Sequence, residues 1–378
     1  MNTPFVDGLT FDDVLLRPGY SDFKRQDISL ETYLTKKIKL TIPFTSAPMD
    51  TVTESGLAIA LAKLGGIGFI HRNLSVENQV KQTSLVKKEG LLVGAAVSSE
   101  GYDERVNKLV AAGVDVVIVD AAHGYAKTVL SAISAIKNKF PSLQVISGNI
   151  ATKEGALASI KAGADGLRVG MGPAAICTTR IVSGMGVPQM TALFEIAPIA
   201  KKYKVPVIAD GGITYSGDMV KALATGASSL MMGSFFASAE ESPGEKVMLA
   251  KEHVPHRFKD ILKIERKEYM FKTYRGMGSV GAMQAGAKMK SEGEYHGKSY
   301  SDRTLVAEGV EGLVPIKGSV SELLDQAIGG IKSGMYYVGT KTISLLHKNT
   351  QFVRISQASL KESHPHDILI TNAGKSYQ

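Results

Sequence analysis

The sequence predicts an α/β fold in which eight strand–helix units close into a barrel, and three observations support this. Short apolar runs alternate with segments of helical periodicity in one uninterrupted series from residue 42 to residue 234. The apolar runs are rich in Val, Ile, Leu and Met without clean polar alternation, which is typical of strands buried on both faces. The chain has 378 residues, 44% of them hydrophobic, and a barrel of this size can form one domain. We therefore expect residues 1–378 to form a single (β/α)8 barrel of the TIM type.

The elements follow from this alternation. Each strand is a short Val/Ile/Leu/Met-rich run ending in a polar or glycine-containing segment, and each helix shows apolar residues at helical spacing. The expected strands are 42–49, 66–71, 91–97, 114–122, 143–150, 166–172, 205–212 and 228–234. The expected helices are 50–64, 75–88, 102–112, 125–138, 153–162, 191–203 and 216–225, with 319–333 closing the barrel. An irregular N-terminal arm precedes them.

The pattern changes after the eighth strand. Residues 240–272 are charged and are expected to be partly helical. Most of the following segment is polar, so we expect a mobile flap at 286–318, with a surface loop of no function as the alternative. Residues 350–378 form a C-terminal tail.

Bulk properties restrict the class of ligand. The formal net charge of +8 favours anionic ligands such as nucleotides, but the basic residues are dispersed, which argues against nucleic acid as a partner. A single cysteine excludes an intramolecular disulfide and fits a reducing cytoplasm. No signal peptide is visible and no apolar run reaches membrane-spanning length, so we expect a cytoplasmic protein without a membrane partner.

The single cysteine, Cys177, lies in a glycine- and proline-rich loop after the sixth strand. Thr178, Thr179 and Arg180 follow it and supply two hydroxyls and a cation. Such surroundings can favour the thiolate, which makes Cys177 a candidate nucleophile. The alternative is a buried structural cysteine, but those occur more often inside apolar periodic runs.

Further candidates follow from the fold, because active sites of these barrels lie at the carboxyl ends of the strands. Glycines there allow a ligand to approach the backbone, so the ends of the seventh and eighth strands predict a phosphate site. Asp120 could accept hydrogen bonds from a ribose diol or could cap a helix. Met49 and Met277 could contact a purine or simply fill the core. The strand-end candidates are Ser46, Met49, His71, Arg72, Asn73, Asp120, His123, Asn149, Gly170–Arg180, Asp210, Gly211, Gly212, Gly233 and Ser234.

Several segments together closely resemble the IMP dehydrogenase/GMP reductase family. They cover nearly the whole chain in the family's order: 9–16, 46–54, 65–71, 167–180, 209–213, 274–279 and 362–367. The resemblance implies that the Cys177 thiolate attacks C2 of a purine nucleotide. In the dehydrogenase, hydride passes from C2 to NAD and a covalent adduct on sulfur is hydrolysed to XMP. In the reductase, the thiol expels ammonia from GMP and NADPH returns the hydride.

The resemblance also implies roles for individual residues. It assigns the nucleotide to Met49, Asp210, Gly211, Gly212, Gly233, Ser234, Tyr274, Gly276, Met277, Gly278 and Glu308, and the cofactor side to Asp120, Asn149, Arg168 and Gly170. It assigns water activation to Thr179, Arg303 and Glu308. A potassium site would join Gly172, Ala174 and Cys177 to Glu362, Ser363 and His364 of a neighbouring subunit, within a homotetramer.

The motifs favour the dehydrogenase, with NAD as cofactor. The 274–279 loop and the 362–367 tail resemble that branch, and the chain lacks the CBS regulatory modules that many of its members carry between the second helix and the third strand. GMP reductase, which would use NADP, is the alternative, because Thr304 replaces the flap tyrosine that would help to activate water. Ala174 and Ala175 in the cysteine loop, and an alanine after Asp120, also depart from the dehydrogenase pattern. A catalytically weak nucleotide-binding paralogue, or a phosphate-binding barrel of another pathway, stays open.

Overall fold

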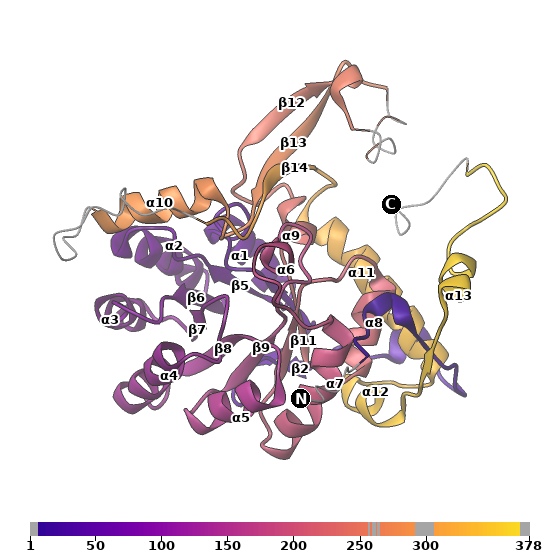
Figure 1. Cartoon of the computed structure of the whole chain (residues 1–378), viewed down its shortest axis with the longest axis horizontal. Coiled ribbons are helices and arrows are strands. Elements are labelled where there is room, and N and C mark those ends of the chain that lie inside the picture. The colour runs from indigo at the N-terminus through magenta and orange to yellow at the C-terminus, as the bar shows by residue number, and fades with distance from the viewer. Residues whose placement is uncertain (1–6, 256–257, 259–261, 263–264, 292–305, 371–378) are drawn as a thin grey trace.

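The computed structural model of the chain describes residues 7–255, 258, 262, 265–291 and 306–370. Eight parallel strands form a closed barrel in the order β10-β11-β4-β5-β6-β7-β8-β9 (Figure 1). This confirms the predicted fold. The strands are β4 Phe44–Ser46, β5 Ile67–Ile70, β6 Val93–Val97, β7 Val116–Asp120, β8 Gln144–Ile150, β9 Gly166–Val169, β10 Val207–Asp210 and β11 Ser229–Met232.

Helices surround the barrel. They are α1 Ser55–Lys63, α2 Val76–Lys88, α3 Asp103–Ala111, α4 Lys127–Lys139, α5 Lys153–Lys161, α7 Gln189–Lys202, α8 Ser216–Ala224 and α11 Val320–Val338. Helix α11 packs against α8 and α1 and so closes the ring, as expected. The Ser319 hydroxyl and the Glu322 carboxylate form a capping box at its start, and Gly339 ends it with a φ of +81°.

The strands are buried on both faces because alternate residues enter two separate cores. Ile67, Phe69 and Ile118 belong to one cluster, which Leu34 and Leu40 of the N-terminal arm complete. Val117 and Val119 belong to the larger cluster that the helices share. This accounts for the continuous apolar runs in the sequence.

A three-stranded antiparallel sheet projects beyond the barrel (Figure 1). It consists of β12 Lys246–Ala250, β13 Glu268–Arg275 and β14 Glu311–Pro315. Residues 240–272, expected to be partly helical, hold β12, most of β13 and, among the residues described there, 3-10 turns at η3 (Lys251–His253), Phe258 and Leu262. Strand β14 lies inside the range expected for the flap, and helix α10 (Val280–Ser291) overlaps its beginning.

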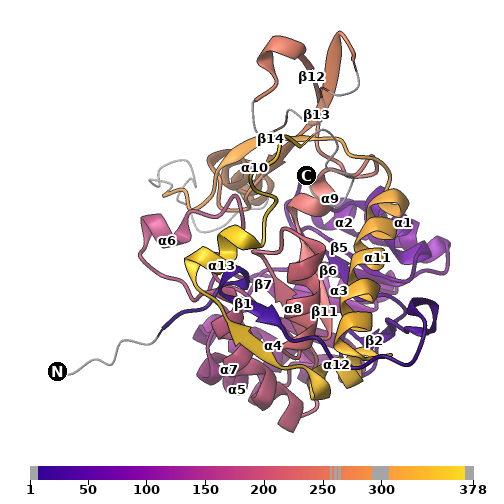
Figure 2. The ribbon, with the colours of Figure 1, turned by 90° about the vertical axis from the view of Figure 1, so that its right-hand side faces the viewer.

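The two ends of the described chain pack together. Strand β1 (Val14–Leu16) of the N-terminal arm pairs with β15 (Phe352–Arg354), and the two lie side by side in indigo and yellow in Figure 2. Within the arm, β2 (Thr32–Tyr33) pairs with β3 (Lys39–Leu40). Helix α12 (Ile343–Asn349) precedes β15, and α13 (Gln357–Glu362) follows it. Four short elements complete the description: α6 Thr179–Val182, α9 Ser234–Ala237 and the 3-10 turns η1 Phe11–Asp13 and η2 Arg25–Asp27. No helix in the described ranges is both long and apolar enough to cross a membrane.

Candidate active site

Cys177 lies in the loop between β9 and α6, at the carboxyl end of the barrel strands. Its side chain is half-buried rather than enclosed in the core. The Cys177 thiol donates to Thr179 Oγ1 at 3.2 Å, and Thr179 Oγ1 donates to Glu308 Oε2 at 2.8 Å. A thiol, a hydroxyl and a carboxylate therefore form one hydrogen-bonded series. This arrangement suits a nucleophile beside a group that can orient water.

Main-chain hydrogen bonds fix this series in place. Thr178 N donates to Glu308 O at 3.0 Å, and Glu308 N donates to Gly278 O at 3.0 Å. Gly276 N donates to Val310 O at 3.1 Å, and Cys177 and Gly309 form an isolated β-bridge. Three segments distant in sequence thus meet beside the sulfur: the cysteine loop, the 276–279 loop that includes Met277, and the segment leading into β14.

Glycines let further strand ends converge near the same loop. A Cβ on Gly211, whose φ is +89°, would lie 3.0 Å from Pro173 Cγ. A Cβ on Gly233 would lie 2.7 Å from Tyr274 Oη and 3.1 Å from Met49 Sδ. Gly212 has a φ of +74° and also faces Pro173, while Ser234 opens α9. The structure therefore brings the predicted phosphate glycines, Met49 and Tyr274 together.

Tyr274 is buried close to Asp210. Burial, and then the negative charge of Asp210, raise the pKa of the Tyr274 phenol well above its usual range. The phenol is consequently neutral at any ordinary pH and can donate a hydrogen bond to an anion.

The predicted cofactor residues form a buried polar network. Arg168 donates to Asp210 at 2.8 Å and to Asp120 at 2.7 Å. Asn149 Nδ2 donates to Asp210 at 2.7 Å and to Gly170 O at 2.8 Å. Burial alone would lower the pKa of the Arg168 guanidinium, but the charges of Asp210 and Asp120 outweigh it and raise that pKa. Asp210, assigned to the nucleotide, is thus tied directly to the residues assigned to the cofactor.

The second carboxylate oxygen of Asp120 accepts from Arg72 Nε at 3.2 Å. Arg72 follows β5 and is about a third exposed, whereas Arg168 is buried. Asp120 therefore lies between two guanidinium groups, and its carboxylate accepts a hydrogen bond from each of them. Sequence reasoning placed Arg72 at the rim but gave it no partner.

Two sets of predicted residues are less completely described: the potassium ligands and the flap residues. Glu362 ends α13, Ser363 and His364 follow it, and the His364 ring packs edge-on at 6.4 Å from Tyr215 of the same chain. Gly172 and Ala174 lie in the cysteine loop. The potassium site that would join these groups stays a prediction. Arg303 and Thr304 lie outside the described residues.

Known proteins resemble the chain over almost its whole length. Residues 8–366 match the model of the IMP dehydrogenase / GMP reductase domain. The chain belongs to this family. Among similar proteins, the inosine-5'-monophosphate dehydrogenase of Borreliella burgdorferi is 43% identical, with 96% of this chain and 97% of the relative covered. The enzyme of that name from Cryptosporidium parvum is 40% identical, with 98% of this chain and 98% of the relative covered. The one from Chlorobaculum tepidum is 37% identical, with 100% of this chain and 99% of the relative covered.

This family member has no room for CBS modules at the place where the motifs locate them. Helix α2 ends at Lys88 and β6 begins at Val93, so only residues 89–92 connect the two. The match to the Chlorobaculum tepidum protein extends over 508 residues, so that relative holds sequence without a counterpart in this 378-residue chain.

The alanine in the cysteine loop of this family member causes no backbone strain. Among described non-glycine residues, only Lys204 and Asp367 have a positive φ, so Ala174 adopts an ordinary conformation. Main-chain carbonyls, the donors that a potassium ion takes in proteins, are present whatever the side chain. The loop conformation therefore tolerates alanine at this position, and the potassium site stays a prediction.

Proposed function

We propose that this chain catalyses the NAD-dependent oxidation of IMP to XMP through a covalent bond between Cys177 and C2 of the purine. The hydrogen-bonded series Cys177–Thr179–Glu308 carries this proposal. The similar proteins reported above are named IMP dehydrogenases, which supports the dehydrogenase over the reductase.

The nucleotide would lie across the mouth of the barrel. The main-chain amides of Gly211, Gly212 and Gly233, with the Ser234 hydroxyl, would hold the phosphate, and the neutral Tyr274 phenol would donate to it. Asp210 would accept from the ribose hydroxyls. Met49, Gly276, Met277 and Gly278 would line the purine, with Glu308 at its edge.

The chemistry needs two changes at C2. The Cys177 thiolate adds to C2, and the hydrogen on C2 departs with its electron pair, leaving the purine bound to sulfur. Water then adds to C2, the carbon–sulfur bond breaks, and XMP leaves as the thiolate is restored. Splitting the reaction in this way replaces one difficult step with two easier ones.

The second change requires a group that removes a proton from water. Thr179 and Glu308 are joined to each other and adjoin the sulfur, so they would orient that water and receive its proton. Arg303 would be an alternative base. Because Thr304 stands where the family's dehydrogenases have a tyrosine, we assign the larger share of water activation to Thr179 and Glu308.

NAD supplies the acceptor for the hydride when it is bound. Asp120, Asn149, Arg168 and Gly170 would face its nicotinamide side. A potassium ion would bind carbonyls of Gly172, Ala174 and Cys177, completed by Glu362, Ser363 and His364 of a second subunit in a homotetramer in the cytoplasm.

Turnover with two substrate pairs tests the proposal. The purified chain is expected to form NADH from IMP and NAD and to leave NADPH unchanged when given GMP. Cys177→Ala is expected to abolish NADH formation, whereas Lys39→Met, which removes an exposed charge of the N-terminal arm, is expected to retain it. Consumption of NADPH with GMP alone would identify a reductase instead.

A further inference from the structure

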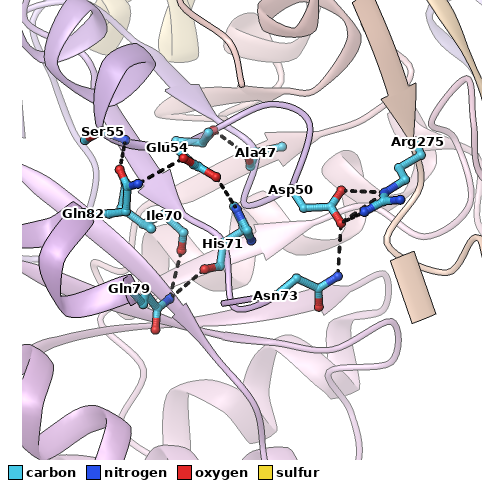
Figure 3. Close-up of polar contacts among 11 residues, drawn as sticks. Ala47, Asp50, Glu54, Ser55, Ile70, His71, Asn73, Gln79, Gln82 and Arg275 are labelled. Carbon is cyan, nitrogen blue, oxygen red and sulfur yellow. Dashed lines mark hydrogen bonds and ion pairs between the residues drawn. The ribbon is translucent and has the colours of Figure 1, made fainter. Parts of the chain in front are cut away.

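One ion pair ties the rim of the barrel to the 276–279 loop. Asp50 directly follows Met49, and its carboxylate accepts from Arg275 Nη2 at 2.7 Å and from Arg275 Nε at 3.1 Å to each oxygen (Figure 3). The Asp50 side chain is 7% exposed and that of Arg275 is 28% exposed. Arg275 N also donates to Thr51 Oγ1 at 3.2 Å. Both the side chain and the main chain of Arg275 are therefore fixed to the segment after β4.

The same pair reaches the neighbouring rim loop and α10. Asn73, two residues after His71 at the end of β5, donates to Asp50 at 3.2 Å (Figure 3). The same Asn73 amide also donates to Ala282 O in α10 at 3.0 Å. Arg275 pairs in register with Glu311 of β14, and Glu311 accepts from Gly281 N at 2.6 Å. The hydrogen bonds to Asp50 are the main cause of a raised pKa for Arg275, and the charges of Asp50 and Glu311 add to it. The Arg275 guanidinium consequently stays charged under assay conditions.

The position of this pair in the chain gives it a consequence for binding. Met49 and Asp50 are adjacent, and Arg275 separates Tyr274 from Gly276. This ion pair therefore sets the position of Met49, in the segment after β4, relative to the 276–279 loop. An arginine that contacts a carboxylate through two nitrogens fixes direction as well as distance.

We propose that Asp50 and Arg275 are positioning residues for nucleotide binding, holding Met49 on one side of the purine and the 276–279 loop on the other. Neither needs to touch the nucleotide. The inference rests on the proposed function, because it uses the nucleotide contacts assigned there. Without the pair, the loop would be misplaced equally in the ground state and in the transition state. The KM for IMP would then rise while kcat changed little.

A double-mutant cycle tests this proposal through Asp50→Asn, Arg275→Gln and the double variant. We expect each variant to raise the KM for IMP about tenfold and to change kcat less than about threefold. The double variant should resemble either single variant, because both remove the same contact. Arg275→Lys keeps the charge but loses the fork geometry and should fall between Arg275→Gln and the parent chain.

Lys87 provides a matched control. Its Nζ lies 2.9 Å from Asp115 Oδ2 with side-chain exposures of 27% and 22%, but it lies at the opposite end of the strands. Lys87→Gln is expected to lower the melting temperature and to leave the KM for IMP unchanged. Direct titration with IMP separates this proposal from the proposed function, since it measures binding even where no turnover occurs. The positioning role is overturned if the Asp50 and Arg275 variants lower stability as Lys87→Gln does but bind IMP as the parent does. It is also overturned if the increase in KM of the double variant equals the two single increases combined.

Discussion

Thr179 Oγ1 donates a 2.8 Å hydrogen bond to Glu308 Oε2 while accepting one from the Cys177 thiol. The threonine and the glutamate are 129 positions apart in the chain. Glu308 lies on the segment that leads into β14, and Thr179 begins α6. Glu308, which lies inside the range expected for the flap, thus contacts the Cys177 nucleophile through the Thr179 hydroxyl.

This contact predicts a separation of the two chemical steps. Thr179→Val keeps the volume but removes the hydroxyl, so hydrolysis of the covalent adduct should slow by about 10²-fold, within the range for general-base catalysis. Formation of the adduct does not need that proton transfer. Stopped-flow absorbance should therefore show a rapid burst of NADH near one per active site, followed by a slow steady rate. Loss of the burst together with the steady rate would contradict this role, and Lys39→Met, which alters only an exposed ion pair, should behave as the parent.

Tyr274 gives a prediction about pH. Because burial and the charge of Asp210 raise the pKa of its phenol above the ordinary value of 10, the group stays protonated throughout the assay range. Tyr274→Phe should raise the KM for IMP about fivefold to tenfold, the loss of one hydrogen bond to an anion. The ratio of variant to parent KM should be constant from about pH 7 to pH 9.5. A ratio that falls toward one as the pH rises would show that the phenol ionises in that range.

The Asp210–Arg168–Asp120 network should contribute strongly to stability. Asp210→Asn leaves the buried Arg168 guanidinium with one carboxylate in place of two, so the free energy of unfolding should fall by about 3 kcal/mol. Chemical denaturation measures this change. Lys39→Met provides the comparison, because Lys39 and Glu31 form an exposed pair, and removing it should have little effect. Equal effects of the two substitutions would contradict the assignment.

His347 should make stability depend on pH. Burial lowers the pKa of its imidazole below 6.5, with a smaller opposing effect from its hydrogen bond to Ala227 O. The unfolded chain then takes up the proton more readily than the folded chain, so stability is present above about pH 6.5 and is lost as the pH falls. Melting temperatures of the parent should decrease from pH 7 to pH 5. His347→Gln should decrease less over that interval, and an equal decrease would rule out this histidine as the cause.

The barrel strands could be predicted because both of their faces are buried, which gives continuous apolar runs such as 116–119. Strand β13 could not, since apolar Met270 is exposed while charged Lys272 is buried, through hydrogen bonds to oxygen atoms of residues 239–242, so the apolar–polar alternation of a strand is broken in the sequence. That pattern does not distinguish a strand from a charged loop. The ends of the predicted strands identified the candidate residues at the rim. The pairing of Asp50 with Arg275 depends on tertiary contacts, which the spacing of residues along the sequence does not reveal. Glu308 was found through the family resemblance.

Mass spectrometry of the chain after a rapid quench tests the central claim most directly. Mixed with IMP and NAD and quenched during turnover, the chain should carry a covalent purine nucleotide on the peptide that contains Cys177, and Thr179→Val should increase its amount. NADH formation with no adduct on that peptide in either protein would contradict the account.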